Sequence, residues 1–187
     1  MQTNEARTAA KSIYWRVVRL MDNHFLIAAT DDGLIYLQYQ AEDAERGGVD
    51  AEAWSELTKW AKHRFPAYSW MENKAALEPY VQQLEEYLRG SRKTFTLPLD
   101  LRGTDFQQSV WRALKEIPHG ETVSYSQMAQ KLDKASAVRA VGTAIGANPV
   151  LIVVPCHRVV GKDGALTGYR GGLVNKEKLL VLEKVGL

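Results

Sequence analysis

Residues 150–158 read Val150-Leu151-Ile152-Val153-Val154-Pro155-Cys156-His157-Arg158, the most apolar run of the chain followed at once by its single cysteine. A continuous apolar run that ends in proline predicts a buried strand whose end fixes the backbone. Thiol chemistry depends on the thiolate, and a nearby cation or base lowers the thiol pKa from its ordinary value of about 8.5. Because His157 and Arg158 can serve that purpose, the segment predicts a reactive cysteine.

The alternative for Cys156 is a purely structural role. Free cysteines are among the residue types most often buried, so a cysteine after a valine-rich strand can simply fill the core. Two potentially charged residues directly after an inert core position are unusual, and their presence favours the reactive thiol.

Composition excludes several classes of protein. One cysteine in 187 residues leaves no internal disulfide framework and suits a reducing compartment. The first residues include Glu5, Arg7 and Lys11 and lack the apolar stretch of a signal peptide. No apolar run approaches the roughly 18 residues of a membrane span. We therefore expect a soluble, cytoplasmic protein without a membrane partner, associated with the nucleoid if the source is bacterial.

The net charge of +2 hides an uneven distribution. Residues 1–90 carry ten Lys/Arg against 14 Asp/Glu, whereas residues 91–187 carry 14 against eight. A polyanionic partner would meet the basic second half. The alternative is a difference between two solvated faces.

The first half predicts a small sheet with helices. Residues 12–20, 24–30 and 33–39 are rich in aliphatic and aromatic side chains and alternate with turn residues, which indicates three antiparallel strands. Helical spacing of apolar residues follows at 53–61 and 77–88. Helical periodicity favours core packing over a ligand platform for the tryptophans of this half, Trp54, Trp60 and Trp70.

Residues 94–99 are a candidate for one more strand, and the domain boundary is expected between Leu99 and Gly103.

Three helices are predicted after this boundary. Capping boxes open the first at Thr104 and the second at Ser124, and the third spans residues 136–147. A tight turn at residues 133–134 gives the last two helices the dimensions of a helix-turn-helix, a pattern also common in proteins that never touch nucleic acid.

The third predicted helix is lined with small residues and carries one long polar side chain, Arg139. A helix that reads bases in the major groove presents several polar side chains, so this composition argues against such readout. Small residues permit close approach to a minor groove, and an isolated arginine can enter the base stack. Close helix-helix packing with Arg139 as a surface charge is the alternative.

Two features follow the cysteine. Residues 161–172 contain five of the 14 glycines; Asp163-Gly164 indicates a turn, and the segment around Tyr169 indicates either another turn or a pocket wall. In the last predicted helix, residues 175–184, Glu183 shares an apolar face with Leu179 and Leu180. A buried carboxylate needs a partner, and His157 is a suitable one. A helix-end surface charge is the commoner alternative.

Several motifs together resemble the O6-alkylguanine-DNA alkyltransferases over residues 104–187. They are Pro155-Cys156-His157-Arg158-Val159, Asn148-Pro149, Arg139-Ala140-Val141-Gly142, Ser124-Tyr125 and Gly168-Tyr169. The first half of the chain resembles these proteins mainly in its length and in its strand-rich start.

This resemblance implies an α+β protein of two domains. Residues 1–101 would form a small antiparallel sheet with helices, ribonuclease-H-like in the family. Residues 102–187 would form a mostly helical DNA-binding and alkyl-acceptor domain that contains a helix-turn-helix. It implies no cofactor and no metal, because the zinc site of some members uses cysteines that this chain lacks before Cys156.

The resemblance also implies a reaction and the residues that perform it. Cys156 would accept the alkyl group of O6-alkylguanine irreversibly, in a single turnover, with possible weaker action on O4-methylthymine. His157 would withdraw the thiol proton through a water, Glu183 would orient the imidazole, Asn148 would support the cysteine turn and Tyr125 would donate to the guanine.

The remaining roles concern substrate and DNA. The flipped base would contact Tyr125, Val159, Gly168, Tyr169 and Arg170, and Arg170 stands where some members have a small hydroxyl residue. Double-stranded DNA would be bound through the minor groove, by a monomer and with little sequence preference. Arg139 would fill the space of the flipped nucleotide, and the other DNA-binding residues would be Ser136, Ala137, Ala140 and Gly142.

From the sequence alone, two competing functions remain open. A cysteine hydrolase or acyl transferase would turn over repeatedly and would need an oxyanion hole. A helix-turn-helix regulator or a non-catalytic lesion-binding protein would have no use for the cysteine. The retained Cys156 favours alkyl transfer.

Overall fold

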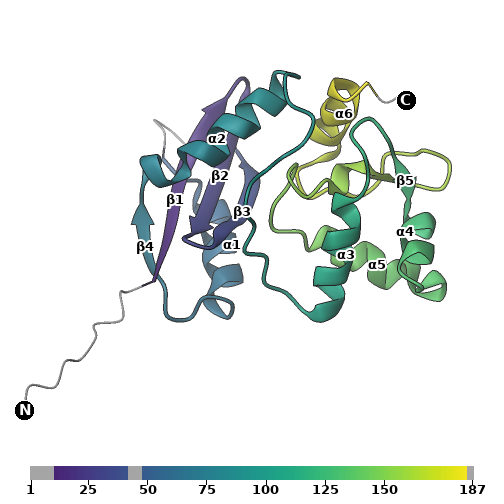
Figure 1. The fold of residues 1–187 in the computed structure, drawn as a ribbon, viewed down its shortest axis with the longest axis horizontal. Coiled ribbons are helices and arrows are strands. Elements are labelled where there is room, and N and C mark those ends of the chain that lie inside the picture. The colour runs from purple at the N-terminus through teal and green to yellow at the C-terminus, as the bar shows by residue number, and fades with distance from the viewer. Residues whose placement is uncertain (1–10, 42–47, 185–187) are drawn as a thin grey trace, which may run out of the picture.

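The computed structural model describes residues 11–41 and 48–184. The chain forms an α+β fold, as predicted, with a sheet and two helices in the first half and mostly helices in the second (Figure 1). Among the described residues, no helix is both long and apolar enough to cross a bilayer.

The sheet of the first half has four strands, in the order β3-β2-β1-β4. The three predicted antiparallel strands are confirmed as β1 (Ser12–Leu20), β2 (Asn23–Thr30) and β3 (Gly33–Gln40). The fourth strand, β4 (Ser69–Glu72), pairs with β1 in parallel and was not predicted. Three of its four residues are exposed, so it lacks the apolar alternation that reveals a strand in a sequence.

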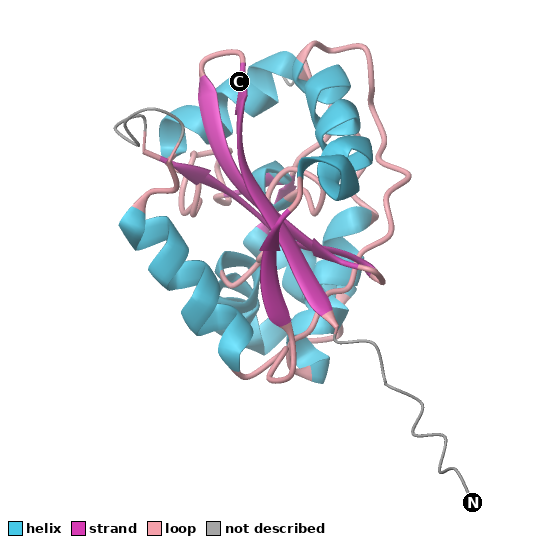
Figure 2. Cartoon of the chain, turned by 90° about the vertical axis from the view of Figure 1, so that its left-hand side faces the viewer, coloured by secondary structure: helices cyan, strands magenta, loops and turns pink. Residues whose placement is uncertain are grey.

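Helices cover both faces of this sheet (Figure 2). Side chains alternate between the two faces along each strand, so each strand contributes residues to both sides. Leu26 and Ala28 of β2 pack with α1 (Ala51–Lys62), and Phe25 and Ile27 pack with α2 (Lys74–Leu88). The tryptophans Trp54, Trp60 and Trp70 pack against the cluster under α1, which confirms their prediction as core residues.

The strand expected at residues 94–99 is wrong. This segment is an extended connection in which only Leu99 forms a bridge, to Leu34 of β3. Pro98 has no N–H for a ladder, and its carbonyl accepts from Leu34 N at 2.9 Å. A side chain at Gly33 would come within 2.7 Å of the Pro98 backbone, so this close approach requires glycine.

The second half contains α3 (Asp105–Lys115), α4 (Tyr125–Lys131), the 3₁₀ turn η2 (Ala135–Ala137) and α5 (Val138–Gly146). Both predicted capping boxes are present. The third predicted helix begins as 3₁₀ turn, and its α-helical part starts two residues later than expected and ends one residue earlier. Asp133, with a φ of 55°, makes the tight turn between the two helices of the helix-turn-helix.

The rest of the second half surrounds the cysteine. It comprises β5 (Val123–Ser124), the 3₁₀ turn η3 (Cys156–Arg158), β6 (Val159–Val160) and α6 (Leu173–Leu182). The short strands β5 and β6 pair in parallel. Helix α6 begins two residues before the predicted position, and Glu183 is its C-cap.

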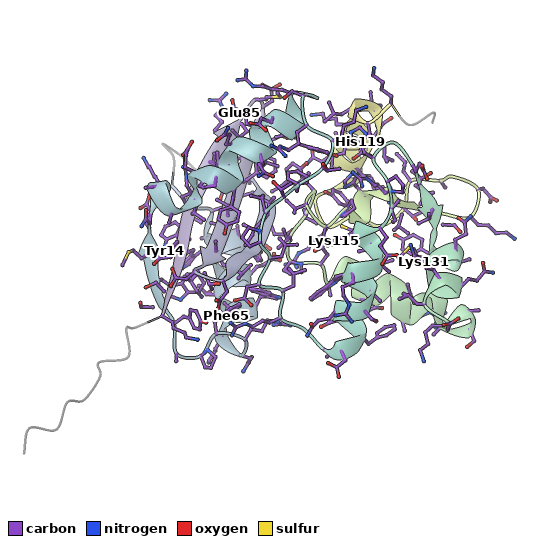
Figure 3. All side chains as sticks on the ribbon, in the orientation of Figure 1. Tyr14, Phe65, Glu85, Lys115, His119 and Lys131 are labelled. Atoms are coloured by element: carbon purple, nitrogen blue, oxygen red, sulfur yellow. The ribbon has the colours of Figure 1, made fainter. Side chains whose placement is uncertain are left out.

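The two halves share one core. The free edge of β3 is covered by the second half, because Leu37 N donates to Pro149 O and Leu151 N donates to Leu37 O, each at 2.9 Å. Apolar residues of β2, β3 and α2 belong to the same buried cluster as those of α3, α5 and the cysteine segment. Side chains fill the boundary between the halves (Figure 3).

Candidate active site

The cysteine is placed by a buried turn, and the strand predicted for residues 150–154 is wrong. Ile152 has a φ of 69°, and Val154 N donates to Val150 O at 3.1 Å, which closes the turn. The apolar run predicted burial correctly, since all five of its residues are buried. It did not reveal the turn, because the side chain that stabilises the turn lies upstream of the run.

That side chain is Asn148, which is completely buried. Its Oδ1 accepts from Val150 N at 3.0 Å, and its Nδ2 donates to Val154 O at 2.9 Å and to Cys156 Sγ at 3.2 Å. One amide therefore fixes both ends of the turn and contacts the sulfur, as expected for a residue that supports the cysteine turn.

Cys156 is 5% exposed and opens into a cavity of about 200 Å³. The other residues that line the cavity come from α4, α5 and the loop before α6; they are Tyr125, Gly142, Ile145, Gly146, Gly168, Tyr169 and Arg170. The sulfur is therefore not sealed in hydrocarbon, and it faces the small-residue helix α5. This geometry favours the reactive cysteine over one that only fills the core.

The expectation of a lowered thiol pKa is wrong for the protein without its substrate. Burial raises the pKa of Cys156 to about 11, although the hydrogen bond from Asn148 and the positive charge of Lys176 act in the opposite direction. The guanidinium of Arg158 points away from the sulfur and donates to Ile117 O at 2.6 Å and to Glu183. At neutral pH the free protein holds Cys156 as a thiol.

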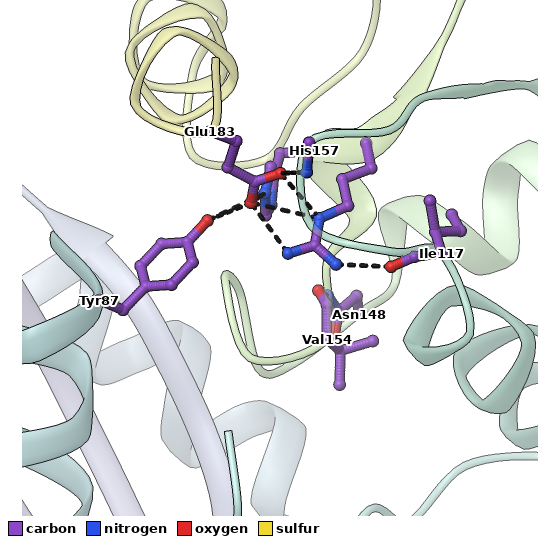
Figure 4. A network of polar contacts seen from close by, with 8 residues as sticks. Tyr87, Ile117, Asn148, Val154, His157 and Glu183 are labelled. Atoms are coloured by element: carbon purple, nitrogen blue, oxygen red, sulfur yellow. Dashed lines mark hydrogen bonds and ion pairs between the residues drawn. The ribbon is translucent and has the colours of Figure 1, made fainter. Parts of the chain in front are cut away.

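A buried network of polar side chains joins His157, which directly follows the cysteine in the chain, to Glu183 (Figure 4). His157 is completely buried, and its Nε2 lies 2.9 Å from Glu183 Oε1. Burial lowers the pKa of His157, and Glu183 opposes that shift. Nδ1 of His157 is buried and has no hydrogen-bond partner among the described residues. The imidazole is thus neutral at pH 7, with one nitrogen held by a carboxylate and the other able to accept a proton.

Glu183 is buried, as the apolar spacing of α6 suggested, and it is not a surface charge. Arg158 donates to it from Nε at 3.0 Å and from Nη2 at 2.9 Å, and Gly120 N donates at 3.0 Å. Burial alone would raise the pKa of Glu183, but the hydrogen bonds from His157 and Arg158 hold it well below its ordinary value. The carboxylate therefore stays ionised at neutral pH.

Two residues of this site were not predicted from the sequence. Lys176 is fully buried, and its Nζ donates to Val159 O and Thr167 O at 2.6 Å each. Burial lowers its pKa to about 8. Its position three and four residues before Leu179 and Leu180 places it on the buried face of α6, a signal that could have identified it. Tyr87, from α2, donates to Glu183, and no local pattern in the sequence indicates this contact.

The loop before α6 forms a wall of the cavity. Tyr125 Oη lies 3.3 Å from both Thr167 O and Gly168 O, which brings the tyrosine of α4 to the loop. A side chain at Gly171 would come within 2.6 Å of Tyr169 Cε1, so glycine allows Tyr169 to pack over the site. Of the two interpretations of this segment, the pocket wall is correct.

Arg170 and Val159 differ in their relation to the cavity. Arg170 lines it, and its Nη2 forms an ion pair of 2.8 Å with Glu56 Oε2 of α1. Val159 is fully buried in β6 and does not line the cavity; its carbonyl oxygen instead accepts from Lys176.

The residues predicted to meet DNA lie together around the start of α5. Ser136, Arg139 and Ala140 are exposed, whereas Ala137 and Gly142 are half-buried. Gly142 also lines the cavity, so the surface of α5 continues into the site of Cys156. The opposite face of α5, with Val141, Ala144 and Ile145, is buried in the core.

No group of three or more His, Cys, Asp or Glu side chains within the described residues is arranged to hold a metal ion.

Comparison with known proteins gives a consistent result over the whole described chain. Residues 13–101 match the ribonuclease-like domain of 6-O-methylguanine DNA methyltransferase, and residues 105–185 match its DNA binding domain. An inducible methylated-DNA–protein-cysteine methyltransferase of Bacillus subtilis is 48% identical over 184 residues, which cover 98% of this chain and 94% of that protein. A methylated-DNA–protein-cysteine methyltransferase of Mycolicibacterium paratuberculosis is 53% identical over 115 residues, 62% of this chain and 70% of that protein.

Solved structures agree with these matches. The O6-methylguanine methyltransferase of Mycobacterium tuberculosis has a TM-score of 0.74 and 38% identity, and covers 92% of this chain and 93% of its own. A structure of the M. tuberculosis protein in complex with DNA has a TM-score of 0.74 and 37% identity, with 91% and 92% covered. With both halves matched, and with the cysteine, histidine and glutamate together at one site, the chain belongs to the 6-O-methylguanine DNA methyltransferase family.

Proposed function

We propose that the protein repairs O6-alkylguanine in DNA by moving the alkyl group to Cys156, as a methylated-DNA–protein-cysteine methyltransferase that acts once. The observation that carries this proposal is the position of the cysteine. Its sulfur opens into a cavity beside a small-residue helix, directly next to a buried histidine-carboxylate pair. Membership of the family supplies the reaction that such an arrangement serves.

The transfer is a single displacement at carbon. Sγ of Cys156 attacks the alkyl carbon, the bond from that carbon to guanine O6 breaks, and its electron pair stays with the guanine. The thiol proton passes through a water to Nδ1 of His157, which has no hydrogen-bond partner in the described part of the chain, and Glu183 stabilises the imidazolium. The product is a thioether that the site has no means to cleave, so each molecule reacts once.

Tyr125 assists the leaving group. Its hydroxyl lies at the cavity wall, 3.3 Å from Gly168 O, where it can donate to the guanine ring. Burial raises the pKa of Tyr125, which keeps the hydroxyl protonated at neutral pH. Donation to the ring lets the base depart without a full negative charge.

The high thiol pKa of the free protein fits this mechanism. A protonated sulfur is poorly nucleophilic, so Cys156 is protected until a substrate occupies the cavity. Asn148 and Lys176 then stabilise the thiolate as it forms, through the hydrogen bond to Sγ and the buried positive charge.

Access to the alkyl group requires that the nucleotide leave the stack, because a thiol cannot reach O6 inside a duplex. The exposed start of α5 supports contact with the minor groove, with Arg139 filling the vacated space and Ser136, Ala137, Ala140 and Gly142 lying against the groove. A single polar side chain on this face supports binding with little sequence preference.

Two further points belong to the proposal. The protein would bind DNA as a monomer, and it would act more weakly on O4-methylthymine.

Arg170 would limit the size of the alkyl group. The ion pair with Glu56 holds its guanidinium at the rim of the cavity, where some family members have a small hydroxyl residue. Both side chains are partly exposed, so the pair contributes at most about 1 kcal/mol and can open for a larger substrate at a low cost.

The chain is divided, in this proposal, into a first domain of residues 1–101 and a DNA-binding and alkyl-acceptor domain of residues 102–187. The matched family segments, 13–101 and 105–185, support that division. A reducing cytoplasm would keep Cys156 available as a thiol.

The test is the stoichiometry of transfer. Purified protein is mixed with an excess of duplex that carries O6-methylguanine, and the mass of the peptide containing Cys156 is followed with time. We expect one methyl group per protein, on Cys156, and then no further reaction. Cys156→Ser should bind the lesion duplex with unchanged affinity and transfer nothing. Continued turnover would instead indicate a hydrolase, and binding without transfer by the natural protein would indicate a regulator.

A further inference from the structure

Tyr87 brings the first half of the molecule into the network behind the cysteine. The residue lies in the last turn of α2, and its side chain is completely buried. Its hydroxyl donates to Glu183 Oε1 and lies 3.4 Å from His157 Nε2 (Figure 4). The ring packs against Phe95 and His119, with centroid distances of 5.1 and 6.1 Å. The hydroxyl is thus aimed at the carboxylate by a rigid aromatic ring.

Arg158 donates to both oxygens of Glu183, whereas the other partners each contact one of them. Oε2 accepts from Gly120 N and from Arg158 Nε. Oε1 accepts from Arg158 Nη2 and Nε, from Tyr87 and from His157. Tyr87 and His157 therefore share one carboxylate oxygen, and each donor reduces the negative charge available to the other.

We propose that Tyr87 is a positioning residue that controls how strongly Glu183 accepts from His157, so that the first half of the chain tunes the base of the second. The inference rests on the proposed transfer of the thiol proton to His157. Tyr87 touches neither the sulfur nor the cavity, and it acts only through the shared oxygen. Burial and the negative charge of Glu183 raise the pKa of Tyr87, so its hydroxyl remains a donor at every pH of interest.

Removing the hydroxyl has a defined electrostatic consequence. Without Tyr87 as a donor, Oε1 keeps more charge for the Nε2–H of His157, which favours the imidazolium over the neutral ring. A base that is already protonated cannot accept the thiol proton, so the rate of transfer falls at a higher pH than in the natural protein. The other titratable or charged groups around this pair are Arg158, Lys176, Cys156, Tyr169 and His119, and Tyr87→Phe leaves all of them in place.

The experiment compares rates of methyl transfer from a methylated duplex between pH 5.5 and 9. For Tyr87→Phe we expect the acidic limb of the profile to move upward by about one pH unit, so that the rate relative to pH 8.5 falls by up to about tenfold at the acidic end of the range. The matched control is Tyr80→Phe, two turns earlier on the same helix, where a half-buried tyrosine packs against the core. Its profile should follow that of the natural protein.

A double variant separates positioning from a structural effect. In Glu183→Gln the side chain carries no negative charge that Tyr87 and His157 could share. Adding Tyr87→Phe to that variant should therefore not change the pH profile of transfer any further. Two results would overturn the proposal. One is a pH profile of Tyr87→Phe that coincides with that of the natural protein. The other is a transfer rate that Tyr87→Phe lowers by the same factor at every pH, both alone and in the Glu183→Gln background. If Glu183→Gln itself transfers at the natural rate, the proton relay is wrong, a failure distinct from that of Tyr87.

Discussion

The interior behind Cys156 and the exposed start of α5 have opposite designs, although the proposed reaction uses both. Glu183 is 3% exposed and accepts from four residues, including Arg158 and Tyr87. Arg139, by contrast, is exposed on a helix whose other solvent-facing residues are small. The groups proposed to transfer the proton are held by many contacts, whereas the arginine proposed to enter the DNA is exposed to solvent.

This difference indicates where each kind of change should be felt. Groups that move a proton must be held in position, and a defect there costs both rate and stability. A side chain that enters the stack of a duplex must stay mobile until DNA is bound, so a defect there should cost only the DNA-dependent step.

The largest effect is expected for Glu183→Gln, which tests the interior directly. The amide leaves Arg158 without a buried counter-charge and His157 without an anionic partner, so transfer should slow by about 10²-fold or more. The free energy of unfolding should fall by about 3 kcal/mol. Single-turnover kinetics and urea denaturation measure the two effects. Glu177→Gln, at an exposed position on the same helix, is the control and should change neither. A natural rate in Glu183→Gln would remove the carboxylate from the mechanism.

Arg139→Ala should have a smaller and selective effect. Repair of methylated duplex should slow by about tenfold to a hundredfold, because the vacated space in the stack is no longer filled. Reaction with free O6-benzylguanine, which needs no base flipping, should keep its natural rate, and stability should be unchanged. Lys59→Ala, on α1, removes a charge elsewhere and serves as the control. Equal losses with both substrates would contradict the proposed role of Arg139.

The smallest effect concerns stability and pH in the natural protein. In the folded protein the pKa of His157 lies below its ordinary value of about 6.5. As pH falls through about 6.5, His157 therefore binds a proton in the unfolded chain but not in the folded protein. Stability should decrease by up to about 1.4 kcal/mol for each pH unit below about 6.5. The lowered pKa of Glu183 adds a further loss below about 4.5, because its contribution is present only above the unfolded value.

Urea denaturation at pH 7.5, 6.5 and 5.5 measures this dependence. His157→Gln should flatten the first step, whereas His63→Gln, at the exposed C-cap of α1, should retain it. A natural protein whose stability is constant from pH 7.5 to 5.5 would show that folding does not lower the pKa of His157.

Local signals in the sequence predicted much of this molecule. Periodicity located β1 to β3 and α1 and α2, and the capping boxes at Thr104 and Ser124 located the starts of α3 and α4, because these features depend on neighbours within one turn or one strand. The errors have a common origin. The turn at residues 150–154 depends on Asn148, and β4 depends on pairing with β1, so neither has a local pattern of its own.

The candidate site divides in the same way. The sequence by itself determined which groups are candidates for the chemistry: one cysteine beside a histidine, a glutamate on an apolar helical face, and a small-residue helix with one arginine. Only the tertiary structure decided how they are arranged. It turned Arg158 toward Glu183 instead of the thiol, raised the pKa of Cys156 by burial, and brought Lys176 and Tyr87 to the site. The reason is physical: charge and chemical type belong to a residue, whereas burial and hydrogen-bond partners depend on segments that meet only when the chain folds.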